Sequence, residues 1–289
     1  MSPGVEQAVE RGLLRMVAAG TTVELCSRRQ VLDLVRTRAA PGGRPLAVGS
    51  VNLDHLHHFR ADNVRAGTSS VDWAFLADGQ PVVRKARTLT GAAWERLTGA
   101  DLLPEIIGLA ETDARAVGFL GGTRDMHVDL RSTLLKRWPD LRIGGFWAPE
   151  RAELTDRRLC AARAEEIAAA GVDVLVVGLG KPRQENWIER YGEATDAGVL
   201  LAFGASADFL SGRSTRAPEW YREHGLEWLH RLTRDPRRLS RRYLVQAPRA
   251  FVRLQRAHIE LATSSPLIEM RTNTAAFTTR AGSVPNGKP

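Results

Sequence analysis

Short apolar runs alternate with helix-like patterns through the middle of the chain. Six runs rich in Val, Leu, Ala and Phe are predicted strands, at 45–51, 71–77, 116–120, 141–147, 172–177 and 199–203. Segments with apolar residues every three or four positions are predicted helices, at about 53–62, 125–138 and 159–170. The unbroken Val/Leu character of 172–177 is typical of a strand that is buried on both faces of a sheet.

The repetition of strand, turn and helix predicts an α/β fold class, with a Rossmann-like, mostly parallel sheet flanked by helices. Several strands end in glycine-containing turns, among them Asp78-Gly79, Gly121-Gly122 and Gly178-Leu179-Gly180. Ligands of such sheets bind in the crevice at the carboxyl ends of the strands. The residues that directly follow the strands are therefore the candidates for chemistry.

The pattern becomes purely helical after Pro218 and divides the chain into four parts. We predict an N-terminal segment of the core with helix or strand at 1–44 and a Rossmann-like core at 45–217. A basic, amphipathic, all-helical appendage follows at 218–262, and a tail at 263–289. The tail is rich in Ser, Thr, Ala, Asn, Gly and Pro and has little periodicity, so we expect it to be disordered.

Positive charge gathers in the appendage. Between Gly212 and Ala257 twelve arginines face four acids, an excess of eight that equals the formal net charge of +8 of all 289 residues. Such a segment is attracted to phosphate, in nucleic acid, in anionic lipid head groups or in a phosphorylated substrate.

Composition narrows the class of protein further. No run of 18 apolar residues occurs, which argues against a membrane span, and the acidic N-terminus lacks the apolar region of a secretion signal. The two cysteines, Cys26 and Cys160, lie far apart without Cys-x-x-Cys spacing. This usage indicates a reducing cytosol and argues against a disulfide scaffold or a thiolate zinc site.

Two groups of polar residues follow predicted strands. Ser50 and Asn52 end one strand, and Asp78 ends the next. A carboxylate just past a buried strand is partly desolvated and can act as a general base, although Asp-Gly also forms an ordinary turn. The second group, Gly178-Leu179-Gly180-Lys181-Pro182-Arg183-Gln184-Glu185, is a glycine turn that opens a helix. It suits a diphosphate or sugar hydroxyls but is neither a P-loop nor Gly-x-Gly-x-x-Gly.

A third group lies in the appendage, where Arg216-Ala217-Pro218 is followed by Glu227-Trp228-x-x-Arg231-Leu232, Asp235-Pro236-x-Arg238 and Arg242-Tyr243. In this order the three groups resemble the WecG/TagA/CpsF family of bacterial glycosyltransferases, glycosyltransferase family 26. The family pattern runs Thr-x-Asn, Ala-Asp-Gly, Arg ahead of Gly-x-Asp, Gly-Gly, Gly-x-Gly-x-Pro-Lys-Gln-Glu, Arg-Ala-Pro and Glu-Trp-x-x-Arg-Leu, then acidic-Pro-x-Arg and Arg-Tyr. The match covers roughly 45–243, with Ser50 in place of Thr and Arg183 in place of Lys.

The resemblance implies an inverting hexosyltransferase. Such enzymes move an N-acetylmannosamine-type or related sugar from a UDP donor to a polyprenyl-diphosphate-linked acceptor, in teichoic acid, capsule or exopolysaccharide biosynthesis. It implies peripheral association with the anionic inner face of the cell membrane, in the cytoplasm. A UDP-glucose-type exopolysaccharide glucosyltransferase remains an alternative, and a homo-oligomer is left open.

The resemblance also implies roles for particular residues of this chain. Asp78 falls on the catalytic carboxylate, with Ser50, Asn52 and Arg96 as its active-site companions. The expected substrate-binding residues are Gly121, Gly122, Gly178, Gly180, Pro182, Gln184, Glu185, Arg231, Arg238 and Arg241.

The residue chemistry agrees with this interpretation. Inverting transfer needs one base for the acceptor hydroxyl and positive charge where the UDP leaving group develops negative charge. The chain contains no Asp-x-Asp, the metal–nucleotide motif of other glycosyltransferases. We therefore expect no metal and no cofactor, with Arg231, Arg238 and Arg241 neutralising the diphosphate.

Two other classes of protein compete with the transferase. A nucleic-acid-binding module would explain the arginines, but the appendage also carries many aromatic and aliphatic residues, which favour a membrane surface over nucleic acid. A nicotinamide-dependent oxidoreductase would explain the sheet, but no Gly-x-Gly-x-x-Gly follows any predicted strand. His55, His57 and His58 resemble a metal cluster, yet without further ligands we expect them to be structural or solvent-facing.

Overall fold

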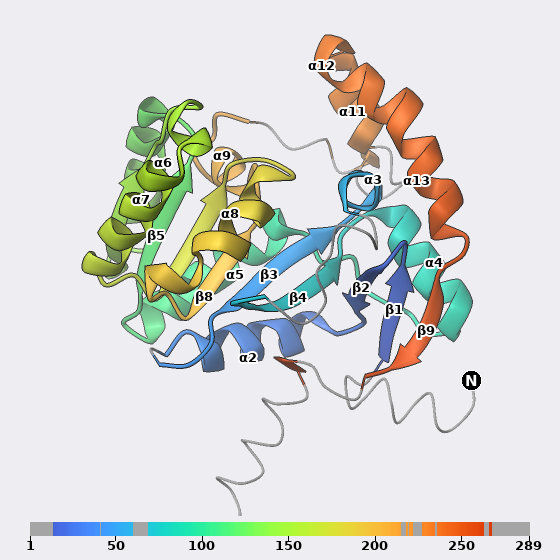
Figure 1. Ribbon diagram of the computed structural model, residues 1–289, viewed down its shortest axis with the longest axis horizontal. Coiled ribbons are helices and arrows are strands. Elements are labelled where there is room, and N and C mark those ends of the chain that lie inside the picture. The colour runs from blue at the N-terminus through green and yellow to red at the C-terminus, as the bar shows by residue number, and fades with distance from the viewer. Residues whose placement is uncertain are drawn as a thin grey trace, which may run out of the picture.

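The computed structural model describes residues 14–40, 42–59, 69–214, 218, 220–221, 227–234, 236–262 and 266–267, with the backbone alone at 227, 228, 231, 238, 242 and 243. One nine-stranded sheet runs through the molecule in the order β6-β5-β7-β8-β3-β4-β2-β1-β9 (Figure 1). The seven strands from β6 to β2 are parallel, whereas β1 is antiparallel to both of its neighbours. The predicted α/β fold with a mostly parallel sheet is confirmed.

All six predicted strands are present within one to two residues of their expected bounds. They are β3 (Leu46–Val51), β4 (Asp72–Ala77), β5 (Ala116–Gly121), β6 (Arg142–Trp147), β7 (Val174–Gly178) and β8 (Val199–Ala202). Every residue of β3 and β5 is buried, because these strands lie inside the sheet and are covered on both faces. This burial explains why their sequences show unbroken apolar runs instead of alternation.

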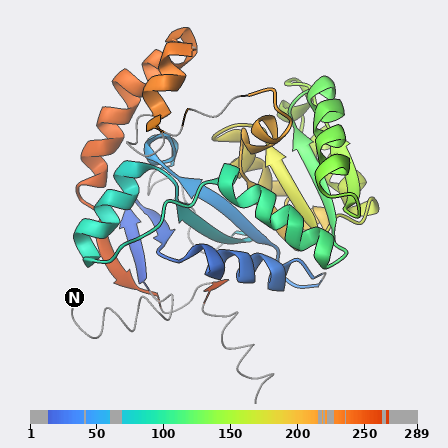
Figure 2. The same cartoon turned by 180° about the vertical axis from the view of Figure 1, so that it is seen from behind.

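Helices pack against the sheet in three clusters. One cluster holds α2 (Arg28–Arg38), α5 (Gly99–Thr112), α6 (Arg124–Arg137) and α9 (Ser206–Leu210). Seen from behind, the blue α2 and the green α5 lie side by side across the sheet (Figure 2). The second cluster holds α7 (Arg157–Ala169) and α8 (Arg183–Tyr191). The third packs α3 (Leu53–His58), α4 (Gln80–Thr90) and α13 (Ala247–Leu254) around β1 and β2.

Three strands were not predicted individually. β1 (Leu14–Ala18) and β2 (Thr21–Glu24) form a hairpin, and β9 (His258–Leu261) pairs with the other edge of β1. The sequence pattern assigned 258–261 to the helical appendage, and that part of the prediction is wrong. Pairing with β1 satisfies backbone groups of an otherwise exposed edge, and four residues are too few to show a period.

The described residues between 227 and 254 form helical pieces that follow one another along the chain. They are α11 (Glu227–Arg234), α12 (Pro236–Ser240), the π-helical turn η4 (Arg241–Gln246) and α13. None of the described helices is both long and apolar enough to cross a membrane. The tail predicted to be disordered lies outside the described residues except for Pro266 and Leu267, and so does the end of the helix predicted at 53–62.

Candidate active site

Asn52 and Asp78 meet where β3 and β4 end side by side. Asn52 is the N-cap of α3, and its Oδ1 accepts a hydrogen bond from the backbone N–H of His55 at 3.2 Å. The other end of the same amide, Nδ2, donates to Asp78 Oδ2 at 3.0 Å. Because the cap fixes which end of the amide carries the oxygen, the donor end must face Asp78. Sequence reasoning paired these residues, and the structure brings them together.

Gly79 allows this close approach. A Cβ at Gly79 would stand 3.0 Å from Asn52 Cβ, closer than ordinary van der Waals contact. The backbone N–H groups of Asp78 and Gly79 both donate to Val51 O, at 3.1 and 3.2 Å. The Asp-Gly turn is therefore tied to the end of β3, and the Asp78 carboxylate is held beside Asn52 at a half-buried position.

Ser50 and Arg96 lie at the same edge of the sheet. Ser50 belongs to β3 and is 8% exposed. Arg96 is half-buried in the segment after α4, and the next residue, Leu97, donates its backbone N–H to Ala77 O at 2.9 Å. This bond ties the backbone next to Arg96 to the strand end that precedes Asp78.

The predicted glycines let the turns after β5, β7 and β8 touch. A Cβ at Gly121, which has a φ of +108°, would stand 2.5 Å from Gly178 O, and one at Gly178 would stand 3.0 Å from Gly204 O. No larger residue fits where these backbones meet. The glycines thus hold the carboxyl ends of these strands close together; this carboxyl edge of the sheet, where α/β proteins bind their ligands, is called the crevice below.

Gln184 and Glu185 begin α8 and are buried under the same crevice. Gln184 Nε2 donates to Ala202 O of β8 at 2.9 Å and to Glu185 Oε1 at 3.2 Å. Burial raises the pKa of Glu185, and the Lys181 charge partly opposes this shift. Gln184 Oε1 and Glu185 Oε2 are buried without a hydrogen-bond partner. Buried acceptors without a donor are costly to the folded state.

Lys181 belongs to the glycine-turn group of the sequence analysis but was not among the expected substrate-binding residues. Its ammonium donates to Ser50 O and lies 3.8 Å from Glu185 Oε1. Its neighbours in the motif, Pro182 and Gln184, were predicted as ligand-binding residues, whereas a lysine in a turn usually points to solvent. Only the folded chain shows that this side chain turns inward.

His55 is structural, as expected. It is 1% exposed, stacks on Phe59 with ring centroids 4.4 Å apart and meets Phe75 edge-on at 4.9 Å. Burial holds its pKa well below the usual value, and the nearby Lys181 charge acts in the same direction. Across the part of the chain that the structure describes, no group of three or more His, Cys, Asp or Glu is arranged to hold a metal.

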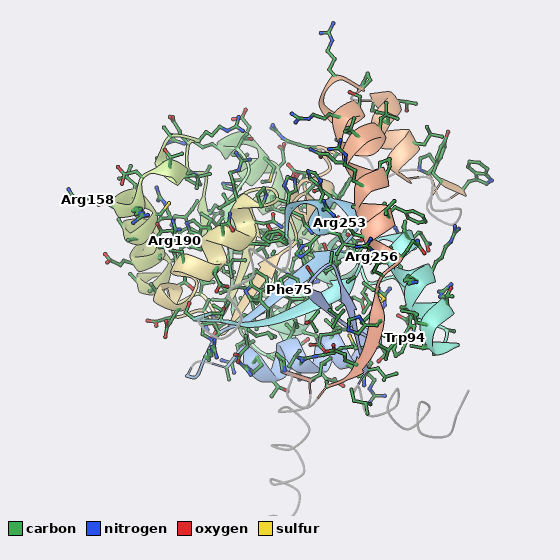
Figure 3. The ribbon with its side chains drawn as sticks, turned by 45° about the vertical axis from the view of Figure 1, so that its right-hand side comes forward. Phe75, Trp94, Arg158, Arg190, Arg253 and Arg256 are labelled. Atoms are coloured by element: carbon green, nitrogen blue, oxygen red, sulfur yellow. The ribbon has the colours of Figure 1, made fainter. Side chains whose placement is uncertain are left out.

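The appendage rises beside the crevice. Figure 1 shows α13 beside α3, the helix that Asn52 caps, with α11 and α12 above them. Arg253 Nη1 donates to Leu56 O of α3 at 3.4 Å, and Figure 3 shows Arg253 and Arg256 on the stretch that joins the appendage to the sheet. Arg241 is exposed. The backbones of Arg231 and Arg238 lie in α11 and α12, but their side chains are outside the described part of the chain.

A separate groove of about 590 Å³ lies between the start of α7 and the outer face of α8. Arg157, Arg183 and Arg190 line it together with Trp187 and Tyr191. Asp78, Asn52 and Gln184 are not among its lining residues, so it is distinct from the crevice.

Comparison with known proteins places the chain in a family. Residues 16–264 match the family described as "Glycosyl transferase WecG/TagA/CpsF family". The chain belongs to this family. The match begins within β1 and extends over the crevice, the appendage and β9, and it confirms the resemblance found in the sequence motifs.

Two relatives carry the same name, N-acetylglucosaminyldiphosphoundecaprenol N-acetyl-beta-D-mannosaminyltransferase. The protein from Bacillus subtilis (strain 168) is 31% identical over 166 residues, which are 57% of this chain and 62% of that protein. The protein from Bacillus spizizenii (strain ATCC 23059 / NRRL B-14472 / W23) is 28% identical over 176 residues, 60% of this chain and 65% of that protein. The matched part thus spans somewhat less than two thirds of the length of these relatives.

Proposed function

We propose that this protein is an inverting, metal-independent glycosyltransferase. It moves a sugar of the N-acetylmannosamine type from a UDP donor to a sugar that is linked through a diphosphate to a polyprenyl lipid. The observation that carries this proposal is the Asn52–Asp78 hydrogen bond at the carboxyl edge of a parallel sheet, in a chain of this family. The names of the two Bacillus relatives support the lipid-linked acceptor and the type of sugar.

Asp78 acts as the general base. It takes the proton of the acceptor hydroxyl while the hydroxyl oxygen attacks the anomeric carbon from the face opposite to UDP. The bond between that carbon and the diphosphate oxygen breaks, and its electron pair leaves with UDP. Asn52 keeps the Asp78 carboxylate oriented, because its amide donates to one carboxylate oxygen and leaves the other for the proton.

Arginines of the appendage stabilise the leaving group. Arg231, Arg238 and Arg241 lie in α11, α12 and η4, helical pieces that follow one another along the chain, and η4 packs beside α3. A charge-assisted hydrogen bond to a diphosphate contributes about 1.5–3 kcal/mol, so three arginines can take the place of a metal ion. Arg96 supplies a further positive charge near the base.

The appendage also brings the enzyme to its lipid substrate. Several apolar side chains of its described residues are exposed: Trp220, Leu229, Leu244, Val245, Phe251 and Val252. An apolar surface combined with many arginines suits the anionic inner face of a cell membrane, where a polyprenyl-linked acceptor is anchored. Binding of nucleic acid would use the arginines but would not require the exposed apolar side chains.

A donor screen tests this function. The purified protein is incubated with a short-chain lipid-diphosphate-N-acetylglucosamine acceptor and, in turn, UDP-N-acetylmannosamine, its uronic acid and UDP-glucose, in excess EDTA. We expect UDP release and a disaccharide-lipid product with one donor, most strongly with UDP-N-acetylmannosamine. A dominant product from UDP-glucose would favour the exopolysaccharide alternative. Activity that requires Mn²⁺ or Mg²⁺ would contradict the metal-independent mechanism, and no transfer from any donor would contradict the function.

A further inference from the structure

Lys181 stands at a position that the family pattern leaves open. In Gly-x-Gly-x-Pro-Lys-Gln-Glu it is the residue before proline, and the position of the usual lysine holds Arg183. Arg183 is exposed, lines the outer groove and donates from Nε to Leu179 O at 3.1 Å. The Lys181 side chain is only 11% exposed and turns toward the crevice. In this chain the inward charge of the motif therefore comes from Lys181.

The Lys181 ammonium links strands that are not neighbours. Lys181 follows β7, whereas its acceptor, Ser50 O, belongs to β3, and β8 lies between the two strands. Backbones two strands apart are separated by about 10 Å, so no direct backbone hydrogen bond can join them. β8 ends at Ala202, and the lysine crosses the sheet at this edge.

The carboxylate that lies next to the Lys181 ammonium, that of Glu185, is buried and hydrogen-bonded. Glu185 lies 3.8 Å from the Lys181 ammonium and accepts a hydrogen bond from Gln184. Gln184 in turn donates to Ala202 O of β8. One network thus joins the carboxyl ends of β7, β8 and β3 across the crevice.

The network reaches the base through Ser50 and Asn52. Ser50 is two residues before Asn52, whose amide both caps α3 and donates to Asp78. We propose that Lys181 is a positioning residue of the transferase, which holds the end of β3 so that Asn52 orients the Asp78 carboxylate. The inference rests on the proposed function, because it assigns Lys181 a part in that same site.

The first test compares Lys181→Met with Lys136→Met. Lys136 is an exposed lysine of α6 and serves as the matched control. A misplaced catalytic group typically costs about 10- to 100-fold in rate, so we expect such a fall in kcat for Lys181→Met. The KM for the UDP-sugar should change by less than about twofold, since the distortion affects the base more than donor contacts. A raised KM with unchanged kcat would show that Lys181 binds the donor instead, and would overturn the proposal.

The second test restores the ammonium chemically. The native thiols of Cys26 and Cys160 are buried and have raised pKa values, mainly because of burial, so a cysteine placed in the crevice reacts first. Lys181→Cys is treated with 2-bromoethylamine, which rebuilds a lysine-like ammonium, or with iodoacetamide, which adds a neutral amide. We expect recovery of at least about half of the lost kcat with the first reagent alone. Equal recovery with both reagents would contradict a role for the charge.

The third measurement does not depend on turnover. Backbone amide hydrogen exchange of residues 50–56 is compared in Lys181→Met, Lys136→Met and the wild type. We expect exchange in this segment to be at least about tenfold faster in Lys181→Met alone, with the rest of the sheet unchanged. If Lys181→Met does not fold, Lys181→Gln replaces it in both assays. A wild type without transferase activity would refute the proposed function, and unchanged exchange would refute the role of Lys181.

Discussion

At the scale of single residues, Asn52 connects the fold to the proposed chemistry. One end of its amide caps α3 and the other end holds Asp78. The Asn52 and Asp78 roles could be expected from the motifs, because both residues directly follow predicted strands. The role of Lys181 could not, since it depends on which side chains turn inward after the chain has folded. For His55 the sequence left a structural and a solvent-facing role open, and the folded chain buries it.

Two substitutions of Asn52 should separate its two roles. Serine is also a good N-cap, but it is too short to keep the bond to Asp78, whereas alanine loses both interactions. We expect Asn52→Ala to lower the free energy of unfolding by about 1 kcal/mol relative to Asn52→Ser. Both variants should lose at least about tenfold in kcat. Urea unfolding and UDP release measure the two effects, and a fully active Asn52→Ser would show that the bond to Asp78 is dispensable.

His55 should make stability depend on pH. Burial lowers its pKa in the folded state, so below about pH 6.5 the unfolded chain binds a proton that the folded chain does not. Its contribution to the free energy of unfolding is present above this pH and is lost as pH falls toward the folded pKa. Buried Glu24 and Glu185, whose pKa values are raised, act in the opposite sense but are common to wild type and variant.

We therefore expect the free energy of unfolding to fall less in His55→Phe than in the wild type when the pH is lowered from 7.5 to 5.5. Each unit of depressed pKa corresponds to about 1.4 kcal/mol over the full titration. The substitution keeps the backbone N–H that Asn52 caps and places an apolar ring between Phe59 and Phe75. Identical pH dependence of the two proteins would contradict a neutral, buried His55.

At the scale of elements, the sequence predicted the strands that carry the crevice and missed those at one end of the sheet. The interior strands are fully apolar and therefore conspicuous. β1 and β2 instead contain Arg15 and Glu24, which pair directly across the hairpin at 2.7 Å. β1 and β2 are only five and four residues long and carry this part-buried ion pair, so neither shows a long apolar run. β9 becomes a strand only because β1 offers it an edge.

The appendage is anchored in the core by α13. Leu254 is fully buried in the cluster around β1, β2, α3 and α4, whereas Val252 on the same helix is 62% exposed. We expect Leu254→Ala to lower the free energy of unfolding by about 2–5 kcal/mol. Val252→Ala, the matched control, should stay within about 0.5 kcal/mol of the wild type. Equal effects in urea unfolding would mean that α13 does not pack as described, and that 218–262 is a detachable arm.

At the scale of the whole molecule, the proposed enzyme must hold a water-soluble donor and a membrane-anchored acceptor at once. The crevice lies at the carboxyl edge of the sheet, and the helices with exposed apolar side chains rise next to it (Figure 1). α3 is common to both parts: its N-cap, Asn52, holds the proposed catalytic base, and α13, which carries exposed apolar side chains, packs against the same helix. The sequence indicates both the polar residues at the strand ends and the apolar residues of the appendage. It does not show that the two lie near each other, because this depends on α13 packing against α3 and on β9 pairing with β1.

Membrane association should depend on the exposed face of α13. Replacing Phe251 and Val252, which are 46% and 62% exposed, with glutamate adds charge without touching the buried Ala250 and Leu254. We expect this double variant to lose most of its co-sedimentation with anionic vesicles, because apolar burial and attraction to the surface both fall. Leu135→Glu on α6, at a residue 48% exposed, is the control and should bind normally. Equal binding by all three proteins would refute this surface.

The most direct test of Asp78 as the general base is the turnover of Asp78→Asn, measured as UDP release with the lipid-linked acceptor. Asparagine keeps the size of the side chain but cannot accept the proton. We predict a fall in kcat of about 10²- to 10⁴-fold, the usual loss for a missing general base, with donor binding by calorimetry nearly unchanged. Turnover close to that of the wild type would remove Asp78 from the mechanism and contradict the account.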